Sequence, residues 1–294
     1  MDYFHFLRYY YGYMAIATSQ QITRYYNEYL HTEITFTKSI MKVLNMDPRQ
    51  IYLKCAGSQW PCIINSTSFA EAKVIIGTKG GAFQQIAQIK SPSVNIRFCF
   101  YQSETQMLSF FISGKVTDIT PYANSKELAV VTVAYTQRPP DDLIEMIGRL
   151  LDANNNAIRR KEERITINED TCRKIGLTSE KTIITISNVP RHCILRDISF
   201  SGAKVVLVGL GNFLVNKDIV LRMEFEEPHE IFNIKGQIKS TGHIEDRKDI
   251  CTASIAFDEN SVTIPYKVHI NNYLTSTRKE NLRNFEENSK KNQN

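Results

Sequence analysis

Two short clusters of polar residues in the second half of the chain have side chains suited to binding an anionic, purine-containing ligand. The first is the run at residues 159–164 (Arg-Arg-Lys-Glu-Glu-Arg), in which Arg160 and Arg164 have R-x-x-x-R spacing. A guanidinium forms paired hydrogen bonds with a phosphate or with the O6/N7 edge of guanine, and its flat face stacks on a base. Arg159 places a third guanidinium directly before the pair. The run therefore predicts a binding site for one compact ligand that carries phosphates and purines.

The second cluster is Asp197-Ile-Ser199-Phe-Ser-Gly202, which has D-x-S-x-x-G spacing. The carboxylate of Asp197 is an acceptor for the N1 and N2 donors of guanine, and the hydroxyl of Ser199 can bond either a base or a phosphate. Gly202 allows a sharp turn or a close approach of the backbone to a ligand. No Walker A motif and no acidic magnesium cluster accompany these residues. The two clusters together specify a guanine nucleotide without a triphosphate.

The elements that must position these residues are mostly short strands, so we expect a mainly β protein. Residues 33–140 and 159–275 each contain several β-branched and aromatic runs separated by turn residues, which predicts two six-stranded-type β-barrels. Residues 141–158 are predicted to form a connecting helix and linker. Prolines and aspartates at its start favour the first turn of a helix, and the apolar residues that follow recur at helical spacing. The three asparagines at 154–156 are expected to end that helix.

The N-terminal end of the chain is predicted to be helical, and the C-terminal end is predicted to lack regular structure. Residues 1–32 contain eight of the fourteen tyrosines, and Ile22, Tyr25, Tyr26 and Tyr29 fall at helical spacing. We expect an N-terminal helical segment packed on a neighbouring domain, with a partner-binding or membrane-surface element as the alternative. Residues 265–274 are predicted to form a helix that closes the second barrel. Residues 276–294 are expected to be a frayed charged tail.

Composition narrows the class of protein without fixing it. The net charge of +5 is compatible with an anionic ligand, with nucleic acid or with a membrane surface. The six cysteines are scattered, which indicates reduced thiols in a cytoplasmic protein, and His192-Cys193 is too small a cluster for a zinc site. No apolar stretch approaches the length of a membrane span.

The order of these features resembles the PilZ family, whose two binding signatures are R-x-x-x-R and D/N-x-S-x-x-G. A linker precedes the arginine run, about thirty residues separate the two motifs, and Gly236-Gln-Ile and the strand at 253–257 are also similar to that family. The resemblance implies a receptor for cyclic di-GMP that needs no metal or other cofactor. It also implies the binding residues, with Ser254 departing from the glycine usual in the late strand. These residues are Arg159, Arg160, Arg164, Asp197, Ser199 and Gly202.

A first barrel followed by a linker and a PilZ domain also resembles the two-barrel receptors typified by flagellar brake proteins. The first barrel lacks both signatures, so the resemblance implies a PilZ-like module that does not bind the ligand and carries the output. We therefore expect a protein partner, possible outputs being motility or a related response, and no catalytic activity.

Two other classes of function are less compatible with the sequence. Residues 76–80 (Ile76-Gly77-Thr78-Lys79-Gly80) resemble the glycine loop with which KH domains clamp RNA. An RNA-binding protein is therefore the alternative, although few basic residues flank this loop. An enzyme is less favoured, because the chain has neither H-E-x-x-H nor a G-x-S-x-G nucleophile elbow.

Overall fold

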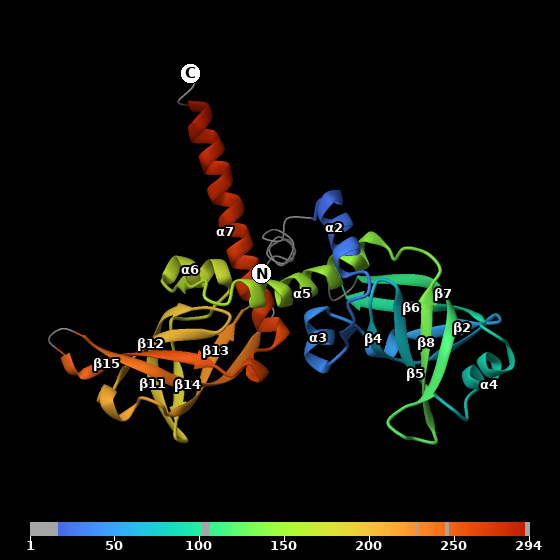
Figure 1. Cartoon of the computed structure of the whole chain (residues 1–294), viewed down its shortest axis with the longest axis horizontal. Coiled ribbons are helices and arrows are strands. Elements are labelled where there is room, and N and C mark those ends of the chain that lie inside the picture. The colour runs from blue at the N-terminus through green and yellow to red at the C-terminus, as the bar shows by residue number, and fades with distance from the viewer. Residues whose placement is uncertain (1–16, 102–105, 227–228, 245–246, 292–294) are drawn as a thin grey trace. The chain divides into compact units, whose positions relative to one another are not determined.

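The computed structural model describes residues 17–101, 106–226, 229–244 and 247–291 (Figure 1). These residues divide into two compact units, with the boundary between Asp152 and Ala153. The division falls within helix α5 (Asp141–Arg159). Each unit is built around one antiparallel sheet, so the expected mainly β fold is confirmed.

The first described element is helix α2 (Ser19–Tyr29), which confirms the helix expected from the tyrosine spacing. Thr18 begins it with a capping box, in which its hydroxyl accepts from the Gln21 backbone and the Gln21 side chain accepts from the Thr18 backbone. Tyr25 and Tyr29 are buried on one side of the helix. Tyr3, Tyr9, Tyr10, Tyr11 and Tyr13 lie outside the described residues.

The first unit contains an eight-stranded antiparallel sheet in the order β1-β4-β5-β8-β7-β6-β2-β3. The sheet is curled, and no pairing between its edge strands β1 and β3 closes it within the described part of the chain. Alternate residues of the long strands are buried, and Leu53, Ile96, Phe98 and Ile112 form the centre of the core. The strands are β1 (Ile34–Thr35), β2 (Tyr52–Cys55), β3 (Ser58–Pro61), β4 (Ile63–Thr67), β5 (Glu71–Gly77), β6 (Ser93–Tyr101), β7 (Met107–Pro121) and β8 (Leu128–Tyr135).

Three short helical elements accompany this sheet. They are α3 (Lys38–Val43), the 3₁₀ turn η1 (Pro48–Gln50) and α4 (Gly81–Gln88).

Helix α5 is longer than the sequence predicted, because it continues through the three asparagines. The side chain of Asn156 is buried and donates from Nδ2 to Asn271 Oδ1 at 2.9 Å, while Asn154 Oδ1 accepts from Lys267 Nζ at 2.8 Å. Asparagine usually ends a helix because its side chain competes for backbone hydrogen bonds. Here two of the three amides bond instead to helix α7, and the prediction of a helix end was wrong for that reason.

The second unit is a closed six-stranded barrel, which confirms the barrel expected in this half (Figure 1). The strands follow the order β10-β13-β14-β15-β12-β11, and pairing of β10 with β11 closes the ring. The two-residue strand β9 (Ile165–Thr166) pairs with the end of β11, at Asp197 and Ile198, beyond the part of β11 that pairs with β10. The barrel strands are β10 (Lys181–Ile186), β11 (Val189–Ile198), β12 (Gly202–Val208), β13 (Asp218–Phe225), β14 (Glu230–Ile244) and β15 (Arg247–Phe257).

Helix α7 (Ile264–Lys291) packs against the barrel through the buried side chains of Tyr266, Ile270 and Leu274. The hydroxyl of Tyr266 donates to Ser199 O at 2.8 Å. The helix does not end near residue 275 but continues to Lys291, so the expected frayed tail was wrong over the described residues. Arg278 pairs with Glu163, and Lys174 of α6 (Glu169–Ile175) lies 3.9 Å from Glu280, so ion pairs stabilise this extension.

All six cysteines are free and buried. Burial raises the pKa of the Cys62 and Cys193 thiols to about 12, because a low-dielectric surrounding disfavours the thiolate.

Candidate ligand-binding site

The arginine run connects the end of helix α5 to strand β9. Arg159 is the last residue of the helix and is exposed, and the Arg160 backbone N–H still bonds to Asn156 O at 2.8 Å. Cations are favourable at this end of a helix, because the carbonyl groups there carry partial negative charge. The helix and the strand thus fix both ends of the run.

Arg160 has an unusual environment for a guanidinium. Its Nη1 atom is buried and has no hydrogen-bond partner among the described residues. A buried donor without an acceptor costs about 1–3 kcal/mol, and such groups are rare in folded proteins. A ligand acceptor at this position would remove that cost.

The D-x-S-x-x-G residues form the turn between β11 and β12. Ser199 is completely buried, and its hydroxyl accepts from the backbone N–H groups of Ser201 at 3.3 Å and Gly202 at 3.1 Å. The same hydroxyl also lies 3.2 Å from Gly202 O. Ser199 therefore shapes the turn from within, whereas the sequence suggested that its hydroxyl would point to a ligand.

Gly202 is required by the close approach of two strands. It pairs with Ala256 of β15, and a Cβ atom at this position would lie 2.3 Å from Ile255 O. Real Cβ atoms do not come so close to a backbone oxygen. No other residue fits here without moving β15, which agrees with the role in shaping the turn that the sequence suggested.

The fold brings the two clusters together. Strand β9 pairs with β11, placing Thr166 opposite Asp197 and Ile165 opposite Ile198. As a result, the guanidinium of Arg164 forms an ion pair with the carboxylate of Asp197 across 33 positions of sequence. The Arg164 side chain is 41% exposed and that of Asp197 19%, so a ligand can reach both groups.

Further contacts hold the run against the barrel, and the sequence did not predict them. Ser201 Oγ donates to Lys161 O at 2.9 Å, and the ammonium of Lys161 pairs with Glu259 in the 3₁₀ turn η3 (Glu259–Ser261). This pairing raises the pKa of Lys161 and lowers that of Glu259. Glu163, between the two signature arginines, pairs with Arg278 of α7. Lys161 and Glu163 belong to the arginine run, but their ion-pair partners lie 98 and 115 positions away in the sequence, so the run alone could not predict these contacts.

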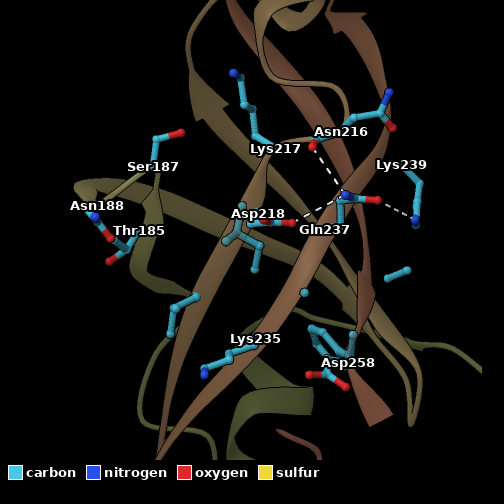
Figure 2. A pocket seen from close by; sticks show the side chains of 15 residues that line it. Thr185, Ser187, Asn188, Asn216, Lys217, Asp218, Lys235, Gln237, Lys239 and Asp258 are labelled. Atoms are coloured by element: carbon cyan, nitrogen blue, oxygen red, sulfur yellow. Dashed lines mark hydrogen bonds between the residues drawn. The ribbon is translucent and has the colours of Figure 1, made fainter. Parts of the chain in front are cut away.

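An open hollow of about 920 Å³ lies on the barrel surface next to the turn. Its lining includes Ala256, the strand partner of Gly202, and Asp258, the neighbour of Glu259. Figure 2 shows Gln237 within it, donating to Asp218 and accepting from Lys239 at 2.6 Å. The lining also contains Lys217 and Lys235. The surface beside the turn is therefore polar and rich in ammonium groups.

The loop that resembles a KH motif has a different environment. It joins β5 to α4, and Thr78 bonds to the backbone of Lys126 and Glu127. Lys79 forms an ion pair with Glu127 at 2.8 Å. The only cation of the loop is thus already paired, and nothing in this geometry favours RNA binding.

Neither a metal site nor a membrane span is found in the described ranges. Those ranges contain no cluster of three or more potential metal ligands. In the same residues, no helix combines the length and the hydropathy needed to cross a bilayer.

The fold and the paired motifs define a PilZ-type barrel that follows a second β domain in the sequence, and comparison with known proteins gives the same class. The PilZ domain model matches residues 158–276, and the PilZN3 domain model matches residues 20–154. The chain belongs to the PilZ-domain family.

A protein of Treponema denticola described as "Cyclic di-GMP binding protein" is 45% identical over 270 residues, covering 90% of this chain and 85% of that protein. Among solved structures, the chain is similar to Borreliella burgdorferi PlzA in complex with c-di-GMP, with 23% identity, a TM-score of 0.40 and coverage of 87% of this chain and 98% of that one. It is also similar to Escherichia coli YcgR in complex with c-di-GMP, with 13% identity, a TM-score of 0.28 and coverage of 92% and 99%.

Proposed function

We propose that this protein is a receptor for cyclic di-GMP and that the ligand binds at the junction of the arginine run and the β11–β12 turn. The observation that carries the proposal is that Arg164 and Asp197 meet at this junction, four residues along the chain from the buried, unpartnered Nη1 of Arg160. Donors for phosphate and for guanine O6/N7 thus lie close to an acceptor for guanine N1/N2. The 45% identical relative, described as a cyclic di-GMP binding protein, supports the same ligand.

The residues have distinct roles in this proposal. Arg160 and Arg164 bind guanine edges and phosphates, Asp197 accepts from a guanine, and Arg159 stacks on a base from its exposed position. Ser199 and Gly202 act differently, since they hold the turn in the shape that the ligand requires. The ligand replaces the Arg164–Asp197 ion pair with its own acceptors and donors, so neither charge is left unpaired when it binds.

The first test is stabilisation by the ligand. A ligand that binds only the folded barrel raises its unfolding temperature, by an amount that grows with the ratio of ligand concentration to Kd. Thermal unfolding of the full chain is expected to shift upward with cyclic di-GMP and not with GTP at the same concentration. Equal unfolding temperatures with and without saturating cyclic di-GMP would contradict the proposal.

Asp197 is expected to contribute selectivity for guanine. Asp197→Ala removes the acceptor for N1 and N2, and losing a hydrogen bond to a charged group costs about 1.5–3 kcal/mol, which is roughly ten- to hundredfold in affinity. Because adenine lacks those donors, binding of cyclic di-AMP should change little. Competition titrations with both dinucleotides measure the ratio. An unchanged ratio would mean that Asp197 only positions Arg164.

Arg159 bears on the number of ligands. In PilZ domains an arginine directly before R-x-x-x-R tends to accompany two intercalated ligand molecules, and an apolar residue there a single one. We therefore expect two cyclic di-GMP molecules per chain, and one in Arg159→Leu, which loses the guanidinium that stacks on the second guanine. Calorimetric stoichiometry measures both values. A ratio of one for the wild type, or of two for the variant, would count against this expectation.

The proposed output passes through a protein partner rather than through catalysis. The first unit carries neither binding signature, so we assign it the contact with the partner and assign the cytoplasm as the place of action. Motility or a related response is the proposed result. In the source organism, a strain carrying the Arg160→Ala, Arg164→Ala double variant should behave like a strain lacking the protein. A double-variant strain with wild-type motility would exclude a ligand-dependent motility output.

A further inference from the structure

A loop at the far end of β12 from the ligand-binding turn exposes three large apolar side chains. The loop joins β12 to β13 through the 3₁₀ turn η2 (Gly211–Phe213). Val208 is 64% exposed, Leu210 59% and Phe213 73%. Single exposed apolar residues are common on protein surfaces, but here three lie within six residues of one loop and make up its exposed apolar surface.

The loop is held in place by its own backbone contacts. Gly209 N donates to Asp249 O at 2.9 Å, and Leu214 N donates to Gly211 O at 2.9 Å. Leu214 is buried in the barrel core. A Cβ atom at Gly211 would lie 2.8 Å from Thr241 Oγ1, so the turn sits directly on strand β14. The loop is therefore anchored by Leu214 while its other large side chains point away from the core.

Basic side chains accompany this apolar surface. The guanidinium of Arg191 lies 3.4 Å from the position that a Cβ on Gly209 would take. Lys217 is exposed three residues after Leu214. The adjoining carboxylate of Asp249 is paired with Arg247 at 3.4 Å, and that of Asp218 accepts from Gln237 in the hollow. Asp218 keeps its negative charge, because the Gln237 amide is neutral, so among the described residues Arg191 and Lys217 face one carboxylate that is not in an ion pair.

We propose that this loop, from Val208 to Phe213, binds the surface of an anionic lipid bilayer. Exposed Leu and Phe side chains enter the boundary between headgroups and acyl chains, while Arg191 and Lys217 remain at the level of the phosphates. A protein partner fits less well, because a stable protein interface buries about 800 Å² on each side, far more than one projecting turn supplies. The apolar residues of the loop lie at the other end of β12 from the ligand-binding turn, although Lys217 also lines the hollow beside that turn. The inference does not depend on the proposed ligand.

The test is cosedimentation of the full chain with vesicles. Vesicles of phosphatidylglycerol and phosphatidylcholine in equal amounts should bind the protein, and pure phosphatidylcholine vesicles should bind it much more weakly. Leu210→Ser combined with Phe213→Ser should lower the partition coefficient at least about tenfold, since burying one such side chain contributes more than a factor of ten. Arg191→Gln combined with Lys217→Gln should lower binding to the anionic vesicles several-fold.

A matched control comes from helix α7. Leu282 is 64% exposed and Phe285 73%, close to the values for Leu210 and Phe213, so Leu282→Ser combined with Phe285→Ser removes a similar exposed apolar area from another surface. This variant should bind vesicles like the wild type, and circular dichroism checks that each variant is folded. If the wild-type protein stays in the supernatant with anionic vesicles, the proposal is overturned. A loop that binds a protein partner instead would give that result. A folded Leu210→Ser, Phe213→Ser variant that binds them like the wild type overturns it as well.

Discussion

Replacing Arg160 and Arg164 together by alanine is expected to reduce the affinity for cyclic di-GMP at least about 100-fold. Each paired arginine contact contributes about 1–3 kcal/mol, or roughly ten- to hundredfold in affinity. The loss is large because the two residues bind different parts of one ligand.

The same substitutions should leave the barrel folded. Arg160 Nη1 has no hydrogen-bond partner among the described residues, so its removal takes away a buried group that costs free energy. The Arg164–Asp197 ion pair is partly exposed, and such pairs contribute about 0–1 kcal/mol. The unfolding temperature without ligand should therefore stay close to that of the wild type.

A control variant for this prediction is Arg222→Ala. Arg222 lies on the same barrel, is 40% exposed against 41% for Arg164, and pairs with Glu224 at 2.8 Å. Losing this arginine alters the net charge without touching the proposed site, so affinity should change less than about threefold. Similar losses in the control and in the double variant would show that net charge, and not the site, drives binding.

The second large effect is expected at Gly202, on stability. In Gly202→Ala the new methyl group would stand 2.3 Å from Ile255 O, so strands β12 and β15 must separate locally. Overpacking of this kind costs about 1–3 kcal/mol and occasionally more, and here the clash is with backbone rather than with a movable side chain. We expect a loss of about 3 kcal/mol in the free energy of unfolding of the second unit, measured by urea denaturation. Ligand affinity should fall as well, because the turn is displaced.

Gly77→Ala provides the comparison. Gly77 ends strand β5, and the nearest atom to a Cβ there is Glu127 O at 3.9 Å, an ordinary contact distance. This substitution should change the free energy of unfolding by less than about 1 kcal/mol. Equal stability of Gly202→Ala and the wild type would mean that β15 moves freely away from the turn, contrary to the packing described above.

Local patterns predicted most of the fold, because the information needed lies within short stretches of sequence. Alternating apolar residues indicated the strands, and the apolar stripe beginning at Leu143 indicated helix α5. The end of that helix could not be predicted in the same way. Asn156 is helical because Asn271, 115 positions later, accepts its amide, and no local rule contains that partner.

The candidate site shows the same division between local and distant information. The spacing identified Arg164 and Asp197, which the fold brings together, and Gly202, which the packing of β12 on β15 requires. The role of Ser199 depends on burial beneath Tyr266, which the motif itself does not encode. The ion pairs of Lys161 with Glu259 and of Glu163 with Arg278 join residues whose proximity appears only once the barrel and α7 are in place.

The most direct test of the central claim is isothermal titration calorimetry of the full chain with cyclic di-GMP, cyclic di-AMP and GTP, repeated with the Arg160→Ala, Arg164→Ala double variant. The account predicts saturable heat with cyclic di-GMP for the wild type, at least about 100-fold weaker binding for the double variant, and much weaker binding of the other two nucleotides. No binding of cyclic di-GMP by folded wild-type protein, or equally tight binding by the double variant, would contradict it.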